Sequence, residues 1–204
     1  NTFSFTESKQ ASINIILLES QPCLNVSLID TVIKTHLVGV YNFHNIAAAL
    51  AVGCYFKLTT KQLKIGIEDY VSANNRSQIV KQNSNQILLD AYNANPSSMG
   101  VALENFKRIQ NSNKIAILGD MFELGATSAK EHLEIINQAI LTKGCIFYFI
   151  GSHFFEQKTS HSNFLFFETF EDLKSHLKEM AISNTSILIK GSRGMALERV
   201  LELL

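Results

Sequence analysis

Polar side chains crowd into the end of an apolar run at residues 88–99, which read LLDAYNANPSSM. A carboxylate such as Asp90 accepts hydrogen bonds from hydroxyl and N–H groups. The amides of Asn93 and Asn95 both donate and accept, and Tyr92 adds a phenol. The stretch has the residue types of a polar ligand site. Its alternative interpretation is a capped strand end, with Asn95 as the cap of a helix and Pro96 at its first position.

Two further apolar runs end in the same manner, in GDMFELG at 119–125 and in KGSRG at 190–194. Lys190 and Arg193 place positive charge in the second of these stretches. A ligand with a free carboxylate needs such a cation, because a helix N-terminus alone contributes only about 0.3 to 1 kcal/mol. Either residue could supply it, and either could instead be a solvated charge. Ser192 is placed to cap the final helix.

The elements that must position these residues follow one plan of an apolar strand, a polar or glycine stop and an amphipathic helix. The expected strands span 86–91, 114–120, 145–151, 164–168 and 186–191. Near-continuous apolar strands that alternate with helices predict an α/β fold with a mostly parallel, Rossmann-like sheet. Ligands of such sheets bind beyond the carboxyl ends of the strands. The three polar clusters should therefore lie on one rim, which favours function over three unrelated caps.

Two of the expected helices have recognisable signals. Ser128 and Glu131 have the spacing of a capping box. Periodicity also predicts an apolar face on this helix and on the final helix of the chain. The expected face consists of Leu133, Ile136 and Ile140 in the first helix, and of Leu197, Val200, Leu201 and Leu204 in the final one.

The first part of the chain is organised differently. Short strand-like runs at 2–6, 13–19, 24–29 and 36–40 precede helical periodicity from Asn45 and again from Thr60 to about Tyr70. The polar segment SANNRSQ at 72–78 breaks both periods. We therefore expect residues 1–75 to be the C-terminal part of one domain and residues 76–204 to form a second domain.

Composition disfavours several function classes. Hydrophobic residues make up 46% of the 204 residues, and 18 basic residues balance 18 acidic ones, so no net charge draws nucleic acid or an anionic membrane. The sequence contains no apolar run long enough to span a membrane and no leader-like start. Cys23, Cys54 and Cys145 lack metal-ligand spacing. We expect a cytoplasmic protein with reduced cysteines and no metal ligands in this stretch.

Four motifs occur in an order and spacing that resemble the Mur ligases of peptidoglycan synthesis: GVYNFHNIAAALAV at 39–52, LLDAYNANPSSM, ILGDMFELGATSAKEH and IKGSRGMALE. The YNANPSSM, GDMxELG and KGSR forms are most similar to the branch that joins D-alanyl-D-alanine to UDP-N-acetylmuramoyl-tripeptide (UDP-MurNAc-tripeptide). A sister ligase that adds a single amino acid is the alternative within the family.

The resemblance implies an ATP-dependent amide ligase with three domains, which bind the UDP-sugar, ATP and the incoming amine. The tripeptide carboxylate would be phosphorylated to an acyl phosphate, and the amine of D-Ala-D-Ala would attack it. On this comparison residues 1–75 resemble the end of the α/β central ATPase domain, and residues 76–204 resemble the C-terminal domain. We expect small-molecule substrates and a monomer.

The resemblance also implies roles for single residues. Arg76 matches the interdomain arginine at phosphate and Asp90 the acid at the nucleotide, so both are catalytic and nucleotide-binding candidates. His44 and Asn45 match the adenine-side pair, although Ala48 stands where many members have a second Asn. His132 is assigned no chemistry. The candidates for holding the dipeptide are Tyr92, Asn93, Asn95, Lys190, Ser192 and Arg193.

No GxxxxGK[ST] phosphate loop occurs in these 204 residues. That loop and the Mg²⁺ ligands are expected upstream of Asn1, so we expect a fragment that orients the amine and does not hydrolyse ATP by itself. Closure across residues 72–76 is the expected motion. A dinucleotide-dependent oxidoreductase is disfavoured because DAYNANP lacks GxGxxG. A noncatalytic ligand-binding module stays open.

Overall fold

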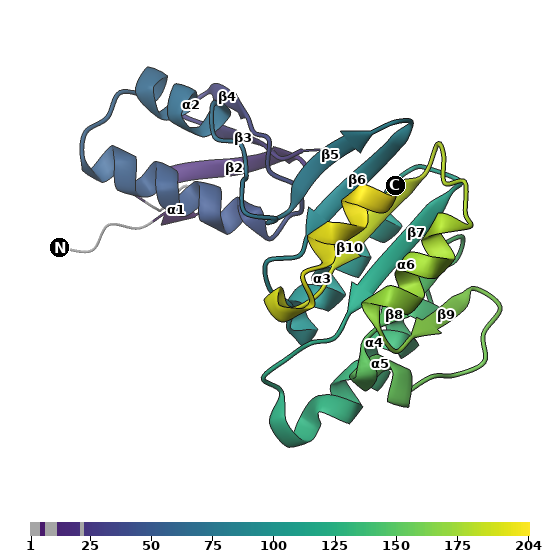
Figure 1. The fold of residues 1–204 in the computed structure, drawn as a ribbon. Coiled ribbons are helices and arrows are strands. Elements are labelled where there is room, and N and C mark those ends of the chain that lie inside the picture. The colour runs from purple at the N-terminus through teal and green to yellow at the C-terminus, as the bar shows by residue number, and fades with distance from the viewer. Residues whose placement is uncertain (1–4, 7–11, 21–22) are drawn as a thin grey trace. The chain divides into compact units, whose positions relative to one another are not determined.

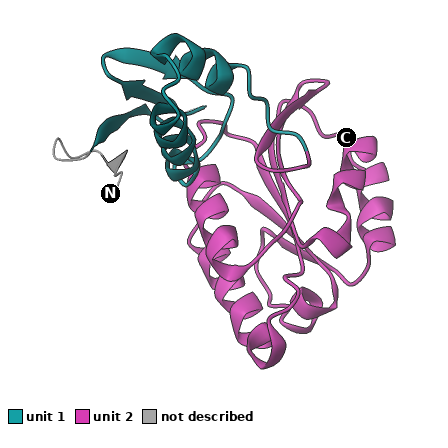
Figure 2. Cartoon of the chain, turned by 90° about the vertical axis from the view of Figure 1, so that its left-hand side faces the viewer, with its two compact units in different colours: residues 1–73 teal, residues 74–204 magenta. Residues whose placement is uncertain are grey.

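The computed structural model describes residues 5–6, 12–20 and 23–204. The chain forms two compact units, residues 1–73 and 74–204 (Figure 2). The second unit begins inside the polar segment at 72–78 that breaks both sequence periods.

In the first unit, the described residues form a four-stranded sheet in the order β1-β2-β3-β4. These strands are β1 (Phe5–Thr6), β2 (Ile13–Glu19), β3 (Asn25–Leu28) and β4 (Thr31–Lys34), followed by helices α1 (Asn42–Tyr55) and α2 (Thr60–Glu68). Of the run expected at 2–6, residues 2–4 lie outside the described residues. The strand expected at 36–40 is wrong. Gly39 there adopts a φ of +87° and its carbonyl accepts from the Asn42 amide, which turns the chain into α1.

Helix α1 forms because its apolar residues recur at helical spacing. Its buried face packs with the inner face of the sheet into one core; the main members are Ile15, Leu24, Val26, Leu28, Ile33, Ile46, Ala47, Leu50 and Leu63. Gly53 allows α2 to approach closely, since a Cβ there would overlap Cδ2 of Leu63. Gly53, directly after the sequence motif, thus serves helix packing, and Ala47 and Ala51 within the motif are buried in the same core.

The second unit contains a six-stranded sheet in the order β5-β6-β10-β7-β8-β9 (Figure 1). Its strands are β5 (Gln78–Gln82), β6 (Asn85–Asp90), β7 (Lys114–Gly119), β8 (Ile146–Ile150), β9 (Phe164–Phe167) and β10 (Ser186–Lys190). All neighbours are parallel except β5 and β6. The mostly parallel α/β sheet and its five expected strands are confirmed. The edge strand β5 was missed, because QIVKQ is short and half-buried.

Helices cover both faces of this sheet, as expected for a parallel sheet. One face packs against α6 (Phe170–Lys178) and the 3₁₀ helix η3 (Leu197–Leu203), in a core that includes Ile87, Ile117, Tyr148, Leu173, Leu177, Ile189, Leu197 and Val200. The alternate strand residues are also buried, and they point to the opposite face. The remaining helices are α3 (Pro96–Lys107), α4 (Ser128–Ile140) and the short α5 (Ser152–Glu156).

The capping box expected at the start of α4 is wrong. Ser128 is the first residue inside the helix, a 3₁₀ turn η1 (Gly125–Thr127) leads into it, and Thr127 makes no side-chain cap bond. The expected face is also wrong at two positions, since Leu133 and Ile140 are 43% and 44% exposed. The buried face runs through His132, Ile135, Ile136 and Ala139. The expected face was wrong because a buried histidine, His132, lies on the inner face, where periodicity looks for apolar residues.

The final helical segment is 3₁₀ rather than α-helical, over Leu197–Leu203. Its expected apolar face is confirmed: Leu197 and Val200 are buried, and Leu201 and Leu204 pack against the same core while partly exposed.

Candidate functional site

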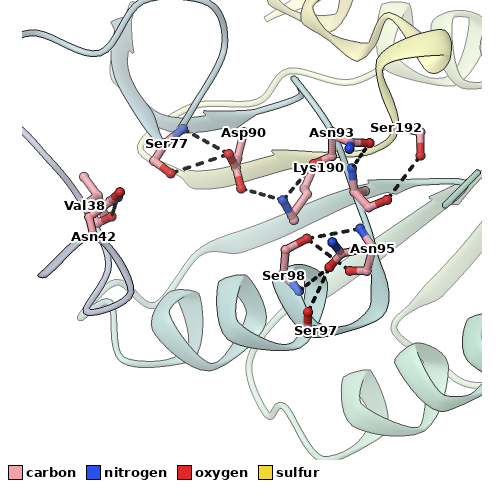
Figure 3. Close-up of polar contacts among 11 residues, drawn as sticks. Val38, Asn42, Ser77, Asp90, Asn93, Asn95, Ser97, Ser98, Lys190 and Ser192 are labelled. Carbon is pink, nitrogen blue, oxygen red and sulfur yellow. Dashed lines mark hydrogen bonds and ion pairs between the residues drawn. The ribbon is translucent and has the colours of Figure 1, made fainter. Parts of the chain in front are cut away.

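The carboxyl ends of β6, β10 and β7 lie side by side, because β10 is hydrogen-bonded between the other two strands. The Ser192 amide donates to the Asp120 carbonyl at 3.1 Å. The Ser192 hydroxyl accepts from the Phe122 amide at 2.8 Å and donates to the Ala94 carbonyl at 3.5 Å. One serine thus joins the three loops at 91–95, 119–125 and 191–194, which we call the rim. Figure 3 shows the bond of Ser192 to the first of these loops. The expectation that the three polar clusters share one edge is confirmed.

Ser192 is not a helix cap, contrary to expectation. It precedes the 3₁₀ turn η2 (Arg193–Met195), and its side chain makes no bond to that turn. The Ser192 hydroxyl instead bonds to Phe122 and Ala94 in the neighbouring loops. These loops lie next to Ser192 because of the strand order of the sheet, which local sequence does not indicate.

Asp90 and Lys190 form an ion pair at the ends of adjacent strands, with Lys190 Nζ 2.6 Å from Asp90 Oδ2. The Lys190 side chain is 2% exposed and that of Asp90 16%. Lys190 also donates to the Asn93 carbonyl at 3.2 Å, and the Ser77 amide donates to Asp90 Oδ1 at 3.1 Å. The structure therefore brings together two residues that the sequence assigned to different ligands. The charge of Lys190 is committed to Asp90.

Asn95 caps α3, as expected, and Pro96 occupies the first turn. Asn95 Oδ1 accepts from the Ser98 amide at 2.8 Å, and the Ser98 hydroxyl accepts from the Asn95 amide at 3.1 Å. This reciprocal box fixes where α3 begins relative to the rim.

Replacing Asn95 with alanine is expected to reduce the free energy of unfolding by about 1 kcal/mol, because the Ser98 amide loses its acceptor. Asn95→Asp keeps the acceptor and adds a negative charge at a helix N-terminus, so it should retain stability. Urea denaturation of the two variants measures the difference. Equal losses for both would show that the cap bond does not stabilise α3.

Arg76, Tyr92 and Asn93 lie beside the ion pair. The Arg76 guanidinium carbon is 3.7 Å from the centroid of the exposed Tyr92 ring, a cation–π geometry. Asn93 is exposed, and its Oδ1 accepts from the Ala94 amide at 2.9 Å. Arg193 reaches Glu198 Oε1 at 3.2 Å, with its side chain 60% exposed. Arg193 is therefore the rim cation that solvent and ligands reach most easily.

Sequence reasoning missed the role of His132 and Asp120, which are both buried. The Asp120 carboxylate accepts from the His153 and Phe154 amides, each at 3.0 Å. His132 Nε2 accepts from the Met121 amide at 3.0 Å, and its Nδ1 lies 2.7 Å from the Ser128 carbonyl. Burial is the main cause that lowers the pKa of His132 below its ordinary value. The one signal in the sequence was a histidine at the spacing of an apolar face.

His44 and Asn45 belong to the first unit and are exposed near the start of α1. Asn45 Nδ2 donates to Asn42 Oδ1 at 3.0 Å, and Asn42 Nδ2 donates to the Val38 carbonyl at 2.8 Å. The helix begins at Asn42, three residues earlier than the periodicity indicated. Asn42 was missed, and it links the loop before α1 to Asn45.

Within the described part of the chain, no three side chains of His, Cys, Asp or Glu gather in a way that would hold a metal ion. Nor does any helix of that part combine the length and the apolar character needed to cross a membrane.

A mostly parallel α/β sheet whose strands end in a shared polar rim has the architecture of a Rossmann-like domain. Residues 75–193 match the family model described as Mur ligase, glutamate ligase domain. The chain belongs to the Mur ligase family.

Curated relatives are similar along most of the chain. UDP-N-acetylmuramoyl-tripeptide–D-alanyl-D-alanine ligase of Treponema pallidum is 33% identical over 178 residues, covering 84% of this chain and 39% of the relative. The ligase of the same name from Rickettsia prowazekii is 29% identical over 216 residues, covering 99% and 47%. The chain therefore spans less than half the length of these relatives.

Solved structures share the fold. A MurF structure from Acinetobacter baumannii has a TM-score of 0.82 at 23% identity, covering 98% of this chain and 46% of that one. MurF ligase from Thermotoga maritima in complex with ADP has a TM-score of 0.76 at 22% identity, covering 100% and 48%.

Proposed function

We propose that this chain is the amine-binding part of an ATP-dependent ligase that adds D-Ala-D-Ala to UDP-MurNAc-tripeptide. The rim carries the proposal: Ser192 joins the loops that contain the three family motifs of residues 76–204. The names of the curated relatives support the same reaction.

In this proposal the rim binds a small zwitterion. Tyr92, Asn93, Asn95 and Ser192 supply phenol, amide and hydroxyl groups, and Arg193 pairs with the dipeptide carboxylate after leaving Glu198. Lys190 acts indirectly, because it is buried against Asp90 and also donates to the Asn93 carbonyl. Its contribution is to fix the position of the Asn93 backbone.

Nucleotide roles are proposed for Arg76 at phosphate, Asp90 at the ribose, and His44 and Asn45 at adenine. The forked, permanently charged guanidinium of Arg76 suits phosphate oxygens, and the exposed Tyr92 ring holds it in place. ATP with Mg²⁺ would activate the tripeptide carboxylate, with the phosphate loop and metal ligands outside these 204 residues. The part of this chain would be to orient the amine, and good orientation accounts for roughly 7 to 11 kcal/mol of a barrier. A monomeric, cytoplasmic enzyme completes the proposal.

Replacing Arg193 with glutamine in the intact ligase tests the proposal. A charge-assisted hydrogen bond contributes about 1.5 to 3 kcal/mol, so the KM for D-Ala-D-Ala should rise roughly ten- to hundredfold while the KM for ATP stays unchanged. Arg199→Gln is the matched control, because Arg199 donates to the Met195 and Ala196 carbonyls within the chain. An unchanged KM for the dipeptide would remove Arg193 from the site.

Substrate choice tests the reaction itself. The intact enzyme should consume ATP with D-Ala-D-Ala and not with single amino acids. Turnover with a single amino acid would identify a sister ligase. Calorimetry that detects neither D-Ala-D-Ala nor the UDP-tripeptide would favour a noncatalytic module.

A further inference from the structure

Backbone groups of residues 120–122, which follow β7, form hydrogen bonds to several neighbouring segments. The Asp120 amide donates to the Ile150 carbonyl and the Asp120 carbonyl accepts from the Ser192 amide. The Met121 amide donates to His132 Nε2, and the Phe122 amide donates to the Ser192 hydroxyl. Two consecutive amides are thus held by side chains from α4 and from the β10 loop.

The contacts of His132 determine its protonation state. Nδ1 faces the Ser128 carbonyl at 2.7 Å, and a carbonyl oxygen only accepts, so Nδ1 carries the proton. Nε2 faces the Met121 amide at 3.0 Å, and an amide only donates, so Nε2 carries a lone pair. The geometry therefore requires a neutral ring with one tautomer.

We propose that His132 is a positioning residue that holds the Met121 amide, and through the adjoining Phe122 amide orients the Ser192 hydroxyl, in its neutral Nδ1-protonated form. This proposal rests on the proposed function in its last step, because Ser192 is taken to contact the dipeptide. The tether itself depends only on the bonds of the rim.

Protonation would break the tether. A proton on Nε2 would oppose the Met121 amide and turn the ring toward Asp120 Oδ1, which is 3.7 Å away. The titratable groups around the ring are Asp120 at the end of β7, Glu131 on α4 and His153 on α5. Burial is the largest cause and lowers the pKa of His132, and it outweighs the Ser128 carbonyl, Asp120 and Glu131, which raise that pKa. The folded protein therefore keeps a neutral ring below the ordinary histidine pKa of 6.5, where the unfolded chain takes up a proton. The contribution of the neutral His132 ring to the free energy of unfolding is therefore fully present above pH 6.5 and declines as the pH falls below that value.

Two amide variants separate the two ring nitrogens. His132→Gln places an acceptor where Nε2 lies, whereas His132→Asn replaces only the donor at Nδ1. Amide exchange measured by NMR on this chain should show the Met121 amide exchanging about tenfold faster or more in His132→Asn, and within about threefold of wild type in His132→Gln. Equal acceleration in both variants, or none in either, would overturn the tether.

The pH dependence of the unmodified protein provides a measurement that does not depend on the variants folding. The ring ¹⁵N shifts should report the Nδ1-protonated tautomer at neutral pH. The Met121 exchange rate, divided by the mean of amides in β8, should rise only as the ring becomes charged below pH 6.5. A doubly protonated ring at neutral pH would refute the proposal.

The intact ligase tests the last step. His132→Asn should raise the KM for D-Ala-D-Ala about tenfold with an unchanged KM for ATP, and His132→Gln should restore it. An altered exchange rate with an unaltered KM for the dipeptide would show that His132 fixes the loop without affecting dipeptide binding, and would overturn the last step. Failure of the wild-type enzyme to use the dipeptide would reject the proposed function and leave the exchange result standing.

Discussion

Replacing Lys190 with methionine is expected to lower the free energy of unfolding by about 3 kcal/mol or more, because it leaves the Asp90 carboxylate without its buried partner. The 2.6 Å pair connects the central strand β10 to β6, and Lys190 also holds the Asn93 carbonyl. Two strand ends and one loop lose a common contact. Urea denaturation measures the loss, and the KM for the dipeptide in the intact ligase should rise with it.

Lys130→Met is the matched control. Lys130 and Glu134 form an exposed pair on α4 at 3.8 Å, and such pairs contribute about 1 kcal/mol or less. The double variant Lys190→Met with Asp90→Leu should lose less than the sum of the single variants, since the uncompensated charge is then absent. Additive losses, or a Lys190→Met loss as small as that of the control, would show that the pair does not couple β6 to β10.

Gly151→Ala is expected to lower the free energy of unfolding by about 4 kcal/mol or more, from backbone strain and two displaced charge-assisted hydrogen bonds. Gly151 precedes α5 with a φ of +115°, and a Cβ there would overlap the carboxyl group of Asp120. That carboxylate is buried and accepts from the His153 and Phe154 amides, so it has no alternative position that keeps both bonds.

Gly144→Ala separates strain from overlap. Gly144 also has a positive φ, of +70°, but nothing lies within 4 Å of a Cβ built there. Its loss should be only about 1 to 2 kcal/mol, the cost of a left-handed conformation alone. Thermal unfolding of the two variants gives the difference. A Gly151→Ala protein as stable as Gly144→Ala would mean that Asp120 moves without cost.

The parallel sheet could be predicted because its strands are buried on both faces, so their central runs, such as ILL in β6 and ILI in β10, are apolar without alternation. Elements whose residues contact segments distant in the sequence could not be predicted in this way. QIVKQ reads as polar because β5 is an edge strand, and the inner face of α4 was misassigned because a fully buried histidine occupies it.

The candidate site divides in the same way. The residue types at the strand ends indicated a shared rim, and the cap by Asn95 follows from local sequence alone. The partners of Lys190 and Ser192 depend on β10 lying between β6 and β7, which no local pattern encodes. Lys190 consequently looked like a cation for a ligand, although in the fold it neutralises Asp90.

The position of β10 has a consequence for the order of folding. The last strand in the chain inserts between β6 and β7, and its lysine meets a partner 100 residues earlier. Before that strand is synthesised, β6 and β7 each lack the partner that β10 provides in the complete sheet. Contacts of such long sequence separation form late and slowly. The nascent polypeptide therefore lacks the complete rim until synthesis of the strand is finished, and one edge each of β6 and β7 is open to aggregation until then.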